Sequence, residues 1–318
     1  MLDKVKSIFI VNKIFNNMLN KKKLNIIKHN KRILHRLEVT NEDFKAYSFL
    51  KEFNNKYNLN FNDIHIKELN LPNKRIRDEG LAYISSIGFY KLIKLCLCNN
   101  EISDINILEK VNCKRLKELS LWSNKILDIN VLEKVNYKEL NILDLSNNKI
   151  SDIKVLENVN FIKLKELNLY INEISDINVL ERVWFKGLKK LNLGSNKISD
   201  ISILKNVDFK NLKILNLSRN KISDISILKN VDFKELNELN LNDNQISDIN
   251  VFKEVNFPKL KKLNLCYNNI SNISVLERVN FKELKDLNLS YNNINKNENY
   301  SIINNLKSKI RKVLIKNE

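Results

Sequence analysis

The sequence predicts an α/β solenoid, a curved horseshoe of stacked units with a parallel sheet on its concave face, short helices or 3₁₀ turns on its convex face, and helical caps at both ends. Three observations lead to this prediction. The chain repeats itself with a period of 24 residues, each period holds the same apolar frame, and 43% of the 318 residues are hydrophobic. A unit of this length buries its apolar face only by stacking on its neighbours, so a continuous core follows.

The frame of each period is Leu-x-x-Leu-x-Leu-x-x-Asn-x-Ile, as in the stretch from Leu188 to Ile198. The leucines at its fourth and sixth positions alternate with other residues, which puts them on one face of a short strand. The stretch from Ser199 to Val207 is predicted to form a turn and a short helix or 3₁₀ segment. A degenerate copy runs from Ile66 to Ile76. The nine regular copies, of which the last is cut short, start at Leu92, Leu116, Leu140, Leu164, Leu188, Leu212, Leu236, Leu260 and Leu284.

This frame resembles the leucine-rich repeat family, and the resemblance covers residues 66–294. It implies one elongated solenoid of about ten units. The predicted organisation is a basic helical N-terminal region at residues 1–65, the solenoid at residues 66–294 and a C-terminal capping helix at residues 295–318.

Two polar positions recur inside the apolar frame. The asparagine at the ninth position, from Asn100 to Asn292, is expected to bond loop backbone of its own and the adjacent unit, because unpaired partners would cost about 1–3 kcal/mol per site. The Ser-Asp pair that follows, as in Ser151 and Asp152, suits turns and helix starts. Because the aspartate recurs in successive units, a row of metal sites along the array is an alternative. A metal site needs several ligands within one unit, so the capping role is favoured.

Both ends of such an array need caps, because a bare terminal unit exposes apolar surface and an unpaired sheet edge. At the C-terminus a helix is predicted to start at Ser301. A basic amphipathic helix can also lie on an anionic membrane, but the array requires a cap here, and the cap is favoured. The apolar face of this helix holds Ile302, Ile303, Leu306, Ile310, Val313 and Leu314.

The N-terminal region shows helix-like spacing in two or three segments. Within residues 1–40, the order Ile14-Phe15, Leu19, Leu24 and then Asn30-Lys31 is similar to the F-box, which implies docking onto a ubiquitin ligase scaffold. The Leu-Pro start of that family is missing, since the first proline of the chain is Pro72. The alternative is a helical cap with a solvated basic face.

The residue types leave little room for catalysis. No Ser/His/Asp or Cys/His arrangement can be built from His29, His35 and His65, which all lie outside the 24-residue array. The four glycines form no phosphate-binding loop. Cys96 and Cys98 share one face of a strand, but zinc needs two further ligands nearby, so free thiols are expected. We therefore expect no enzymatic activity, no cofactor and no metal.

Function is expected on the concave face, where the outward strand positions are free to vary. The seventh and eighth positions of the repeat vary most. Exposed aromatic and arginine side chains dominate interface energetics, whereas scattered surface aromatics without a partner are the alternative. The candidate contact residues are Trp122, Tyr170, Arg219, Asp243, Tyr267 and Tyr291.

The expected function is a non-catalytic scaffold, working as a monomer, that binds another protein across its concave sheet. The alternatives are an F-box-like substrate receptor of a ubiquitin ligase, and binding of nucleic acid or an acidic partner through basic side chains. The net charge is +18, but residues 1–40 and 296–318 together carry +12 of it. Nucleic acid is not the expected partner, because Glu118, Glu166 and Glu238 stand beside or between the lysines of the second repeat position.

The sequence also predicts where the protein works. No apolar run is long enough for a membrane-spanning helix or for the core of a secretory signal. The four cysteines are not clustered at the ends of the array as disulfide caps would be. A cytoplasmic or nuclear location is therefore expected, and secretion is not.

Overall fold

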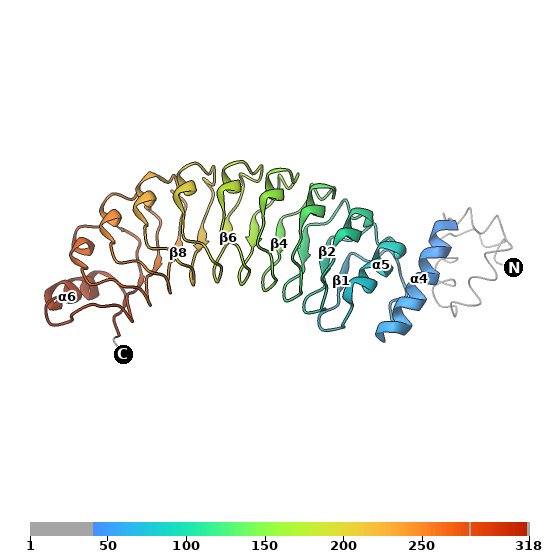
Figure 1. Cartoon of the computed structure of the whole chain (residues 1–318), viewed down its shortest axis with the longest axis horizontal. Helices are drawn as coiled ribbons and strands as arrows, with labels where there is room; N and C mark the ends of the chain where they lie inside the picture. The colour runs from blue at the N-terminus through green and yellow to red at the C-terminus, as the bar shows by residue number, and fades with distance from the viewer. Residues whose placement is uncertain (1–40, 280, 317–318) are drawn as a thin grey trace, which may run out of the picture.

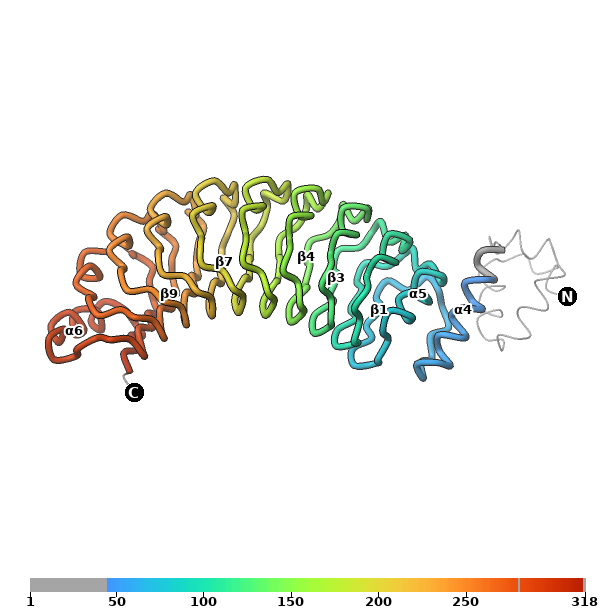
Figure 2. Tube along the Cα trace, in the orientation of Figure 1, coloured from blue at the N-terminus to red at the C-terminus, as the bar shows by residue number. Residues whose placement is uncertain are grey.

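The computed structural model describes residues 41–279 and 281–316 and shows an arc of stacked coils (Figure 1). Short strands line the inner side of the arc, and short helices line its outer side. The tube trace shows that each repeat makes one turn of the coil (Figure 2). The predicted solenoid with a parallel sheet is therefore confirmed.

The sheet has eleven parallel strands in sequence order among the described residues. Neighbouring strands pair in strict register, so that the central leucine of one strand faces that of the next, as in Leu95 and Leu119. The strands are β1 (Glu68–Asn70), β2 (Lys94–Cys96), β3 (Glu118–Ser120), β4 (Ile142–Asp144), β5 (Glu166–Asn168), β6 (Lys190–Asn192), β7 (Ile214–Asn216), β8 (Glu238–Asn240), β9 (Lys262–Asn264), β10 (Asp286–Asn288) and β11 (Lys312–Leu314).

The outer side of the regular units consists of 3₁₀ helices, as the turn-and-short-helix pattern predicts. In seven of the eight described 3₁₀ helices, the first backbone N–H donates to a repeated aspartate, for example Lys154 N to Asp152 Oδ1 at 2.8 Å, which confirms the capping role. In the eighth, Ser274 N donates to Asn272 Oδ1 at 2.9 Å. The 3₁₀ helices are η2 (Asn106–Lys110), η3 (Asn130–Glu133), η4 (Lys154–Glu157), η5 (Asn178–Glu181), η6 (Ser202–Lys205), η7 (Ser226–Asn230), η8 (Asn250–Lys253) and η9 (Ser274–Glu277).

One continuous apolar core runs between the strands and the outer helices. The leucines of the frame and the isoleucines that follow it are buried along its length. Aromatic side chains fill the opposite wall, and Phe185 stacks on Phe209 of the next unit with ring centroids 6.3 Å apart. Burial of these side chains supplies most of the stabilisation, at about 25 cal/mol per Å² of apolar surface.

The repeated asparagines join each coil to the one before it, as expected from the sequence. Asn172 Nδ2 donates to the carbonyls of Leu145 in the preceding unit and Leu169 in its own, both at 3.1 Å. Its Oδ1 accepts the backbone N–H of Ile150 at 3.0 Å. One buried amide thus satisfies three loop backbone groups, which makes the ninth position structural.

The N-terminal end of the array is helical. Helix α4 (Asn41–Tyr57) packs against helix α5 (Arg77–Ile87) in the degenerate first unit. Phe53 lies at their contact, with its ring centroid 6.1 Å from that of Tyr83. Helix α5 stands where the regular units carry a 3₁₀ segment. The F-box-like stretch of residues 1–40 lies outside the described residues.

The C-terminal end differs from the single capping helix expected at residues 295–318. Helix α6 (Tyr300–Lys309) buries Ile303 and Leu306, but it ends before Ile310. The chain then forms β11, in which Val313 pairs with Leu287 of β10. The expected helical role of Val313 and Leu314 was wrong, because the open edge of β10 needs backbone partners and β-branched side chains favour a strand.

Candidate functional site

The concave face of the sheet carries the outward side chains of the third and fifth repeat positions. At the third position, oppositely charged neighbours form ion pairs between adjacent strands. The pairs are Lys94 with Glu118 at 2.7 Å, Lys190 with Glu166 at 2.8 Å and Lys262 with Glu238 at 3.2 Å. The side chains are partly exposed, so the pairs contribute little stability, but they neutralise this column. The hydrogen bond to Glu118 raises the pKa of Lys94.

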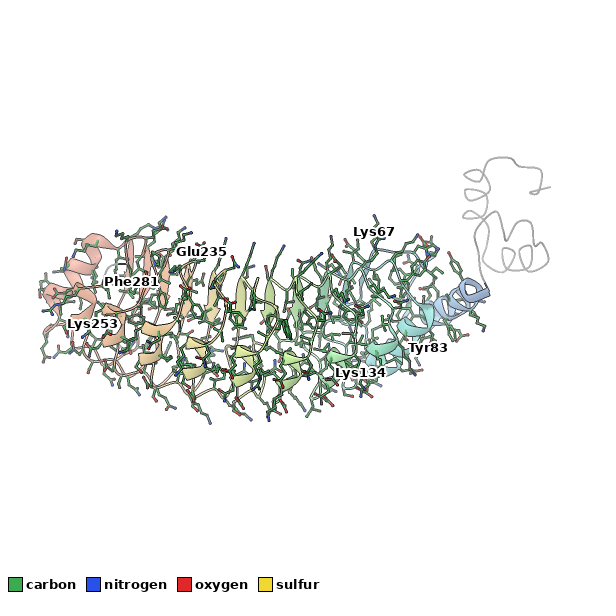
Figure 3. All side chains as sticks on the ribbon, turned by 90° about the horizontal axis from the view of Figure 1, so that it is seen from above. Lys67, Tyr83, Lys134, Glu235, Lys253 and Phe281 are labelled. Atoms are coloured by element: carbon green, nitrogen blue, oxygen red, sulfur yellow. The ribbon has the colours of Figure 1, made fainter. Side chains whose placement is uncertain are left out.

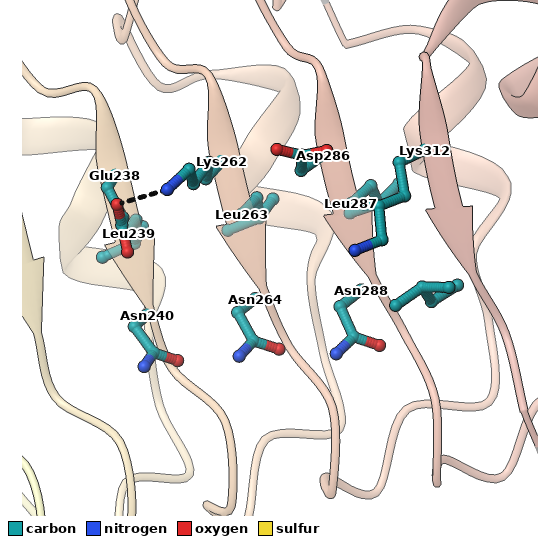
Figure 4. A pocket seen from close by; sticks show the side chains of 11 residues that line it. Glu238, Leu239, Asn240, Lys262, Leu263, Asn264, Asp286, Leu287, Asn288 and Lys312 are labelled. Carbon is teal, nitrogen blue, oxygen red and sulfur yellow. Dashed lines mark hydrogen bonds and ion pairs between the residues drawn. The ribbon is translucent and has the colours of Figure 1, made fainter.

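The fifth position forms a column of half-buried amides from Asn168 to Asn288. Each oxygen accepts a backbone N–H two residues on, as in Ser218 N to Asn216 Oδ1 at 3.0 Å. Two of the Nδ2 groups bond the preceding unit: Asn216 Nδ2 donates to Asn192 Oδ1 at 2.8 Å, and Asn168 Nδ2 donates to Ser146 Oγ at 3.3 Å. Figure 4 shows Asn240, Asn264 and Asn288 of this column side by side. The column therefore presents mainly N–H donors to solvent.

Two hollows open on the concave face. One, of about 310 Å³, is lined by amides of the fifth position together with Tyr170 and Arg219. Gly194 leaves room beside Tyr170, because a Cβ at this residue would lie 3.0 Å from the Tyr170 ring. The other, of about 290 Å³, lies above β8 to β11 and includes Lys262 and Lys312 (Figure 4).

The eighth position has a left-handed backbone in all nine regular units, with φ between 51° and 57°, for example 52° at Arg219 and 57° at Tyr291. A hydrogen bond to the following unit holds it there, as in Arg219 N to Asn242 O at 2.8 Å. Left-handed backbone is unfavourable for most side chains, yet the position carries isoleucine, arginine and tyrosine. From Ile171 onward these side chains form what we call the position-eight row: Ile171, Ser195, Arg219, Asp243, Tyr267 and Tyr291.

The row brings four of the six predicted contact residues together. Arg219 Nε lies 3.6 Å from Asp243 Oδ2. In the next two units, the rings of Tyr267 and Tyr291 stack with centroids 4.3 Å apart and an interplanar angle of 11°. Four successive units thus present a charged pair and then an aromatic pair, although Tyr267 remains 50% exposed.

The other two predicted residues occupy the seventh position. Tyr170 lines the same hollow as Arg219 and so belongs to this site. Trp122 is 43% exposed and lies two units before Tyr170, with Ser146 at the equivalent position between them. Sequence reasoning did not foresee the hydrogen bonds within the fifth-position amide column or the left-handed backbone of the eighth position. The recurring Asn-Asn and Ser-Asn pairs at the eighth and ninth positions could have indicated the latter, since asparagine tolerates that conformation.

Two thiols contact each other near the N-terminal end of the concave face, and they are the only such pair among the described residues. Cys96 ends β2, Cys98 follows it, and their Sγ atoms are 2.6 Å apart. Cys98 Sγ also lies 3.2 Å from Ser120 Oγ. All four cysteines are free thiols. No three His, Cys, Asp or Glu side chains converge on a metal position in the described part of the chain.

Charged side chains also lie on both lateral sides of the array. Seen from above, Lys67 and Glu235 lie along one edge of the array and Lys134 along the other (Figure 3). Lysines of the second position are mostly exposed, but acidic residues accompany them, as in the pair of Lys261 and Glu283 at 3.5 Å. None of the described helices has the length and apolar character needed to cross a lipid bilayer.

Family models match the repeats directly. A model of two leucine-rich repeat copies matches residues 90–134, 186–230 and 210–254, and a second leucine-rich repeat model matches residues 234–294. No curated protein matches the chain in sequence.

Solved structures share the fold. An internalin (inlF) from Listeria monocytogenes is 27% identical with a TM-score of 0.53, over 86% of this chain and 88% of that chain. Internalin C2 from the same organism is 26% identical with a TM-score of 0.52, over 64% of this chain and 87% of that chain. A leucine-rich repeat protein of Leptospira interrogans is 22% identical with a TM-score of 0.51, over 85% and 86% of the two chains.

The single stack of coils defines the class of the molecule, a repeat solenoid with one extended inner sheet. Within that class, the matched repeat models show that the chain is built of leucine-rich repeats. Proteins of this fold are typically interaction scaffolds.

Proposed function

We propose that this protein is a non-catalytic scaffold that binds a partner protein across its concave face, with the position-eight row as the main contact. The observation that carries the proposal is the row itself. Arg219, Asp243, Tyr267 and Tyr291 occupy four successive units on a backbone fixed by hydrogen bonds to the next unit. Tyrosine and arginine are the residues that most often dominate binding energy.

Rigidity adds to the suitability of this surface. Binding costs free energy for each side chain and loop that has to be ordered, and a fixed backbone reduces that cost. The stacked rings of Tyr267 and Tyr291 hold each other in place before a partner arrives. The amide column and Arg219 supply donors beside them, so the fitting partner presents an apolar group next to carbonyl or carboxylate acceptors.

The experiment is affinity purification with mass spectrometry on three versions of the full chain. Tyr267→Asn with Tyr291→Asn removes both rings and keeps a residue that tolerates φ near 55°, as Asn147 does in its own unit. Trp184→Ala is the matched control, because Trp184 is 63% exposed and lies between η5 and β6, away from the concave strands. A partner retained by the native chain and the control but lost by the double variant supports the proposal. Equal retention by all three contradicts it.

We also place this activity in the cytosol or nucleus. The positions of the four cysteines support this location, because they are not clustered at the ends of the array, where the disulfide caps of a secreted array would lie.

A further inference from the structure

We infer that Cys96 and Cys98 form a modification site that closes to an intramolecular disulfide by exchange with a small disulfide such as oxidised glutathione. The inference is separate from partner binding by the position-eight row. It rests on three features of the two thiols: the distance between them, their unequal exposure and their chemical surroundings.

The geometry favours closure of this pair. Leu97 between the two cysteines is buried, so Cys96 and Cys98 both face the concave side. Their Sγ atoms are 2.6 Å apart, whereas a disulfide bond is about 2.05 Å long. The side chains thus already bring the two sulfurs into contact, and closure further requires the Cβ atoms to approach to about 3.8 Å.

The two thiols are unequally exposed. Cys96 is half-buried at the end of β2 and open to a small reagent, whereas Cys98 is 2% exposed. The hydrogen bond from the Cys98 thiol lowers the pKa of Cys96, and the neighbouring Lys94 ammonium acts in the same direction. Donation to Cys96, together with burial, raises the pKa of Cys98. Cys96 is therefore the attacking thiolate and Cys98 the resolving thiol.

The exchange balances in two steps. In the first, the Cys96 thiolate attacks one sulfur of oxidised glutathione, a mixed disulfide forms on Cys96, and one glutathione thiolate leaves. The Cys98 thiol then no longer donates to a thiolate; it gives its proton to solvent and attacks the Cys96 sulfur, which expels the second glutathione thiolate. Two protein thiols are oxidised and one glutathione disulfide is reduced to two thiols.

The remaining cysteines provide an internal control. Cys113 is buried and its thiol lies 3.4 Å from the carbonyl of Phe89, and burial raises its pKa to about 12. Cys266 is also buried, and burial raises its pKa as well. Neither is hydrogen-bonded to another thiol among the described residues. Both are expected to stay reduced while the first pair reacts.

The test treats the reduced full chain with oxidised glutathione, blocks remaining thiols with iodoacetamide after unfolding, and digests with trypsin. The segment from Leu95 to Lys110 contains both cysteines and no internal Lys or Arg. The expected result is that this peptide is unalkylated and lighter by two hydrogens, while Cys113 and Cys266 are alkylated. In Cys98→Ser, the same treatment is expected to leave glutathione attached to Cys96. Cys113→Ser is the matched control and should close like the native chain.

Three results would overturn the inference. The native chain could keep glutathione on Cys96 without closing, the Leu95–Lys110 peptide could remain doubly alkylated, or the pair could form links only between chains. Circular dichroism of each variant confirms that its coils are intact, so a loss of closure reports on the thiols.

Discussion

Asn148 Nδ2 donates to the carbonyl of Leu121 in the preceding unit at 3.1 Å, and this bond recurs along the array at intervals of one repeat. The same amide bonds Leu145 O and Ser146 O, while its oxygen accepts the N–H of Ile126. This side chain thus joins each coil to the previous one, in addition to the strand pairing and the shared core. The rigidity proposed for the concave face depends on these bonds.

Asn148→Ala is expected to lower the free energy of unfolding by about 3 kcal/mol, because it leaves buried carbonyls and one N–H without partners. Urea unfolding followed by circular dichroism measures the change. The control is Asn147→Gly, which keeps the left-handed backbone and removes only the bond from Asn147 Nδ2 to Ser123 Oγ. An equal loss of unfolding free energy in the two variants would contradict the role of the ninth-position asparagine in joining neighbouring units.

Ile171→Asn is expected to stabilise the chain by about 1 kcal/mol. Ile171 is β-branched and held at φ 52°, a conformation that costs such residues about 1–2 kcal/mol and suits asparagine better. The side chain is 40% exposed, so little burial is lost. Differential scanning calorimetry should give a higher Tm than for the native chain. Ser195→Asn, at the same position of the next unit, is the control and should change Tm less.

Truncation after Lys309 is expected to promote self-association. It removes β11, so that Leu289 N loses Leu314 O and Tyr291 N loses Lys316 O as acceptors. The open edge of β10 then resembles the exposed strand edges that pair with other chains. Light scattering at rising protein concentration measures the assembly state. Truncation after Lys316 keeps β11 and should behave as the native chain does. A truncated chain that stays monomeric with unchanged Tm would contradict the role given to β11.

Cys96 is expected to react with iodoacetamide at lower pH than an ordinary cysteine, whose pKa is about 8.5. The Cys98 thiol and the Lys94 ammonium stabilise the Cys96 thiolate, whereas Asp144 opposes it. The thiolate therefore persists as pH falls below the ordinary value. In Cys98→Ala the donor is gone, and the half-reacting pH should rise toward 8.5. Alkylation rates between pH 5 and 9, read by mass spectrometry, test this; identical profiles would contradict it.

Much of the fold could be predicted because one frame is repeated nine times. A leucine at each fourth and sixth position has only one way to be buried when the units stack, and the Asn of the ninth position is explained by the loop it closes. The C-terminal end could not be predicted in the same way. The apolar residues from Ile302 to Leu314 match a helical face, and only the open edge of β10 reveals that Val313 belongs to a strand.

The sequence could predict which residues belong to the candidate site, but it could not predict how their side chains contact one another. Variation at the seventh and eighth positions pointed to Tyr170, Arg219 and Tyr267. Stacking of Tyr267 on Tyr291 depends on the curvature and backbone angle of successive units, which no residue pattern states. Likewise, Cys96 and Cys98 were expected to share a face, but their contact appears only in three dimensions.

The most direct measurement is photo-cross-linking from the concave face. A photoreactive phenylalanine analogue in place of Tyr267 occupies a row position that is exposed, while the same analogue in place of Trp184 lies away from the inner strands. The proposed function predicts that a partner retained by the native chain is linked covalently from position 267 and not from position 184. Linkage from position 184 alone would contradict it.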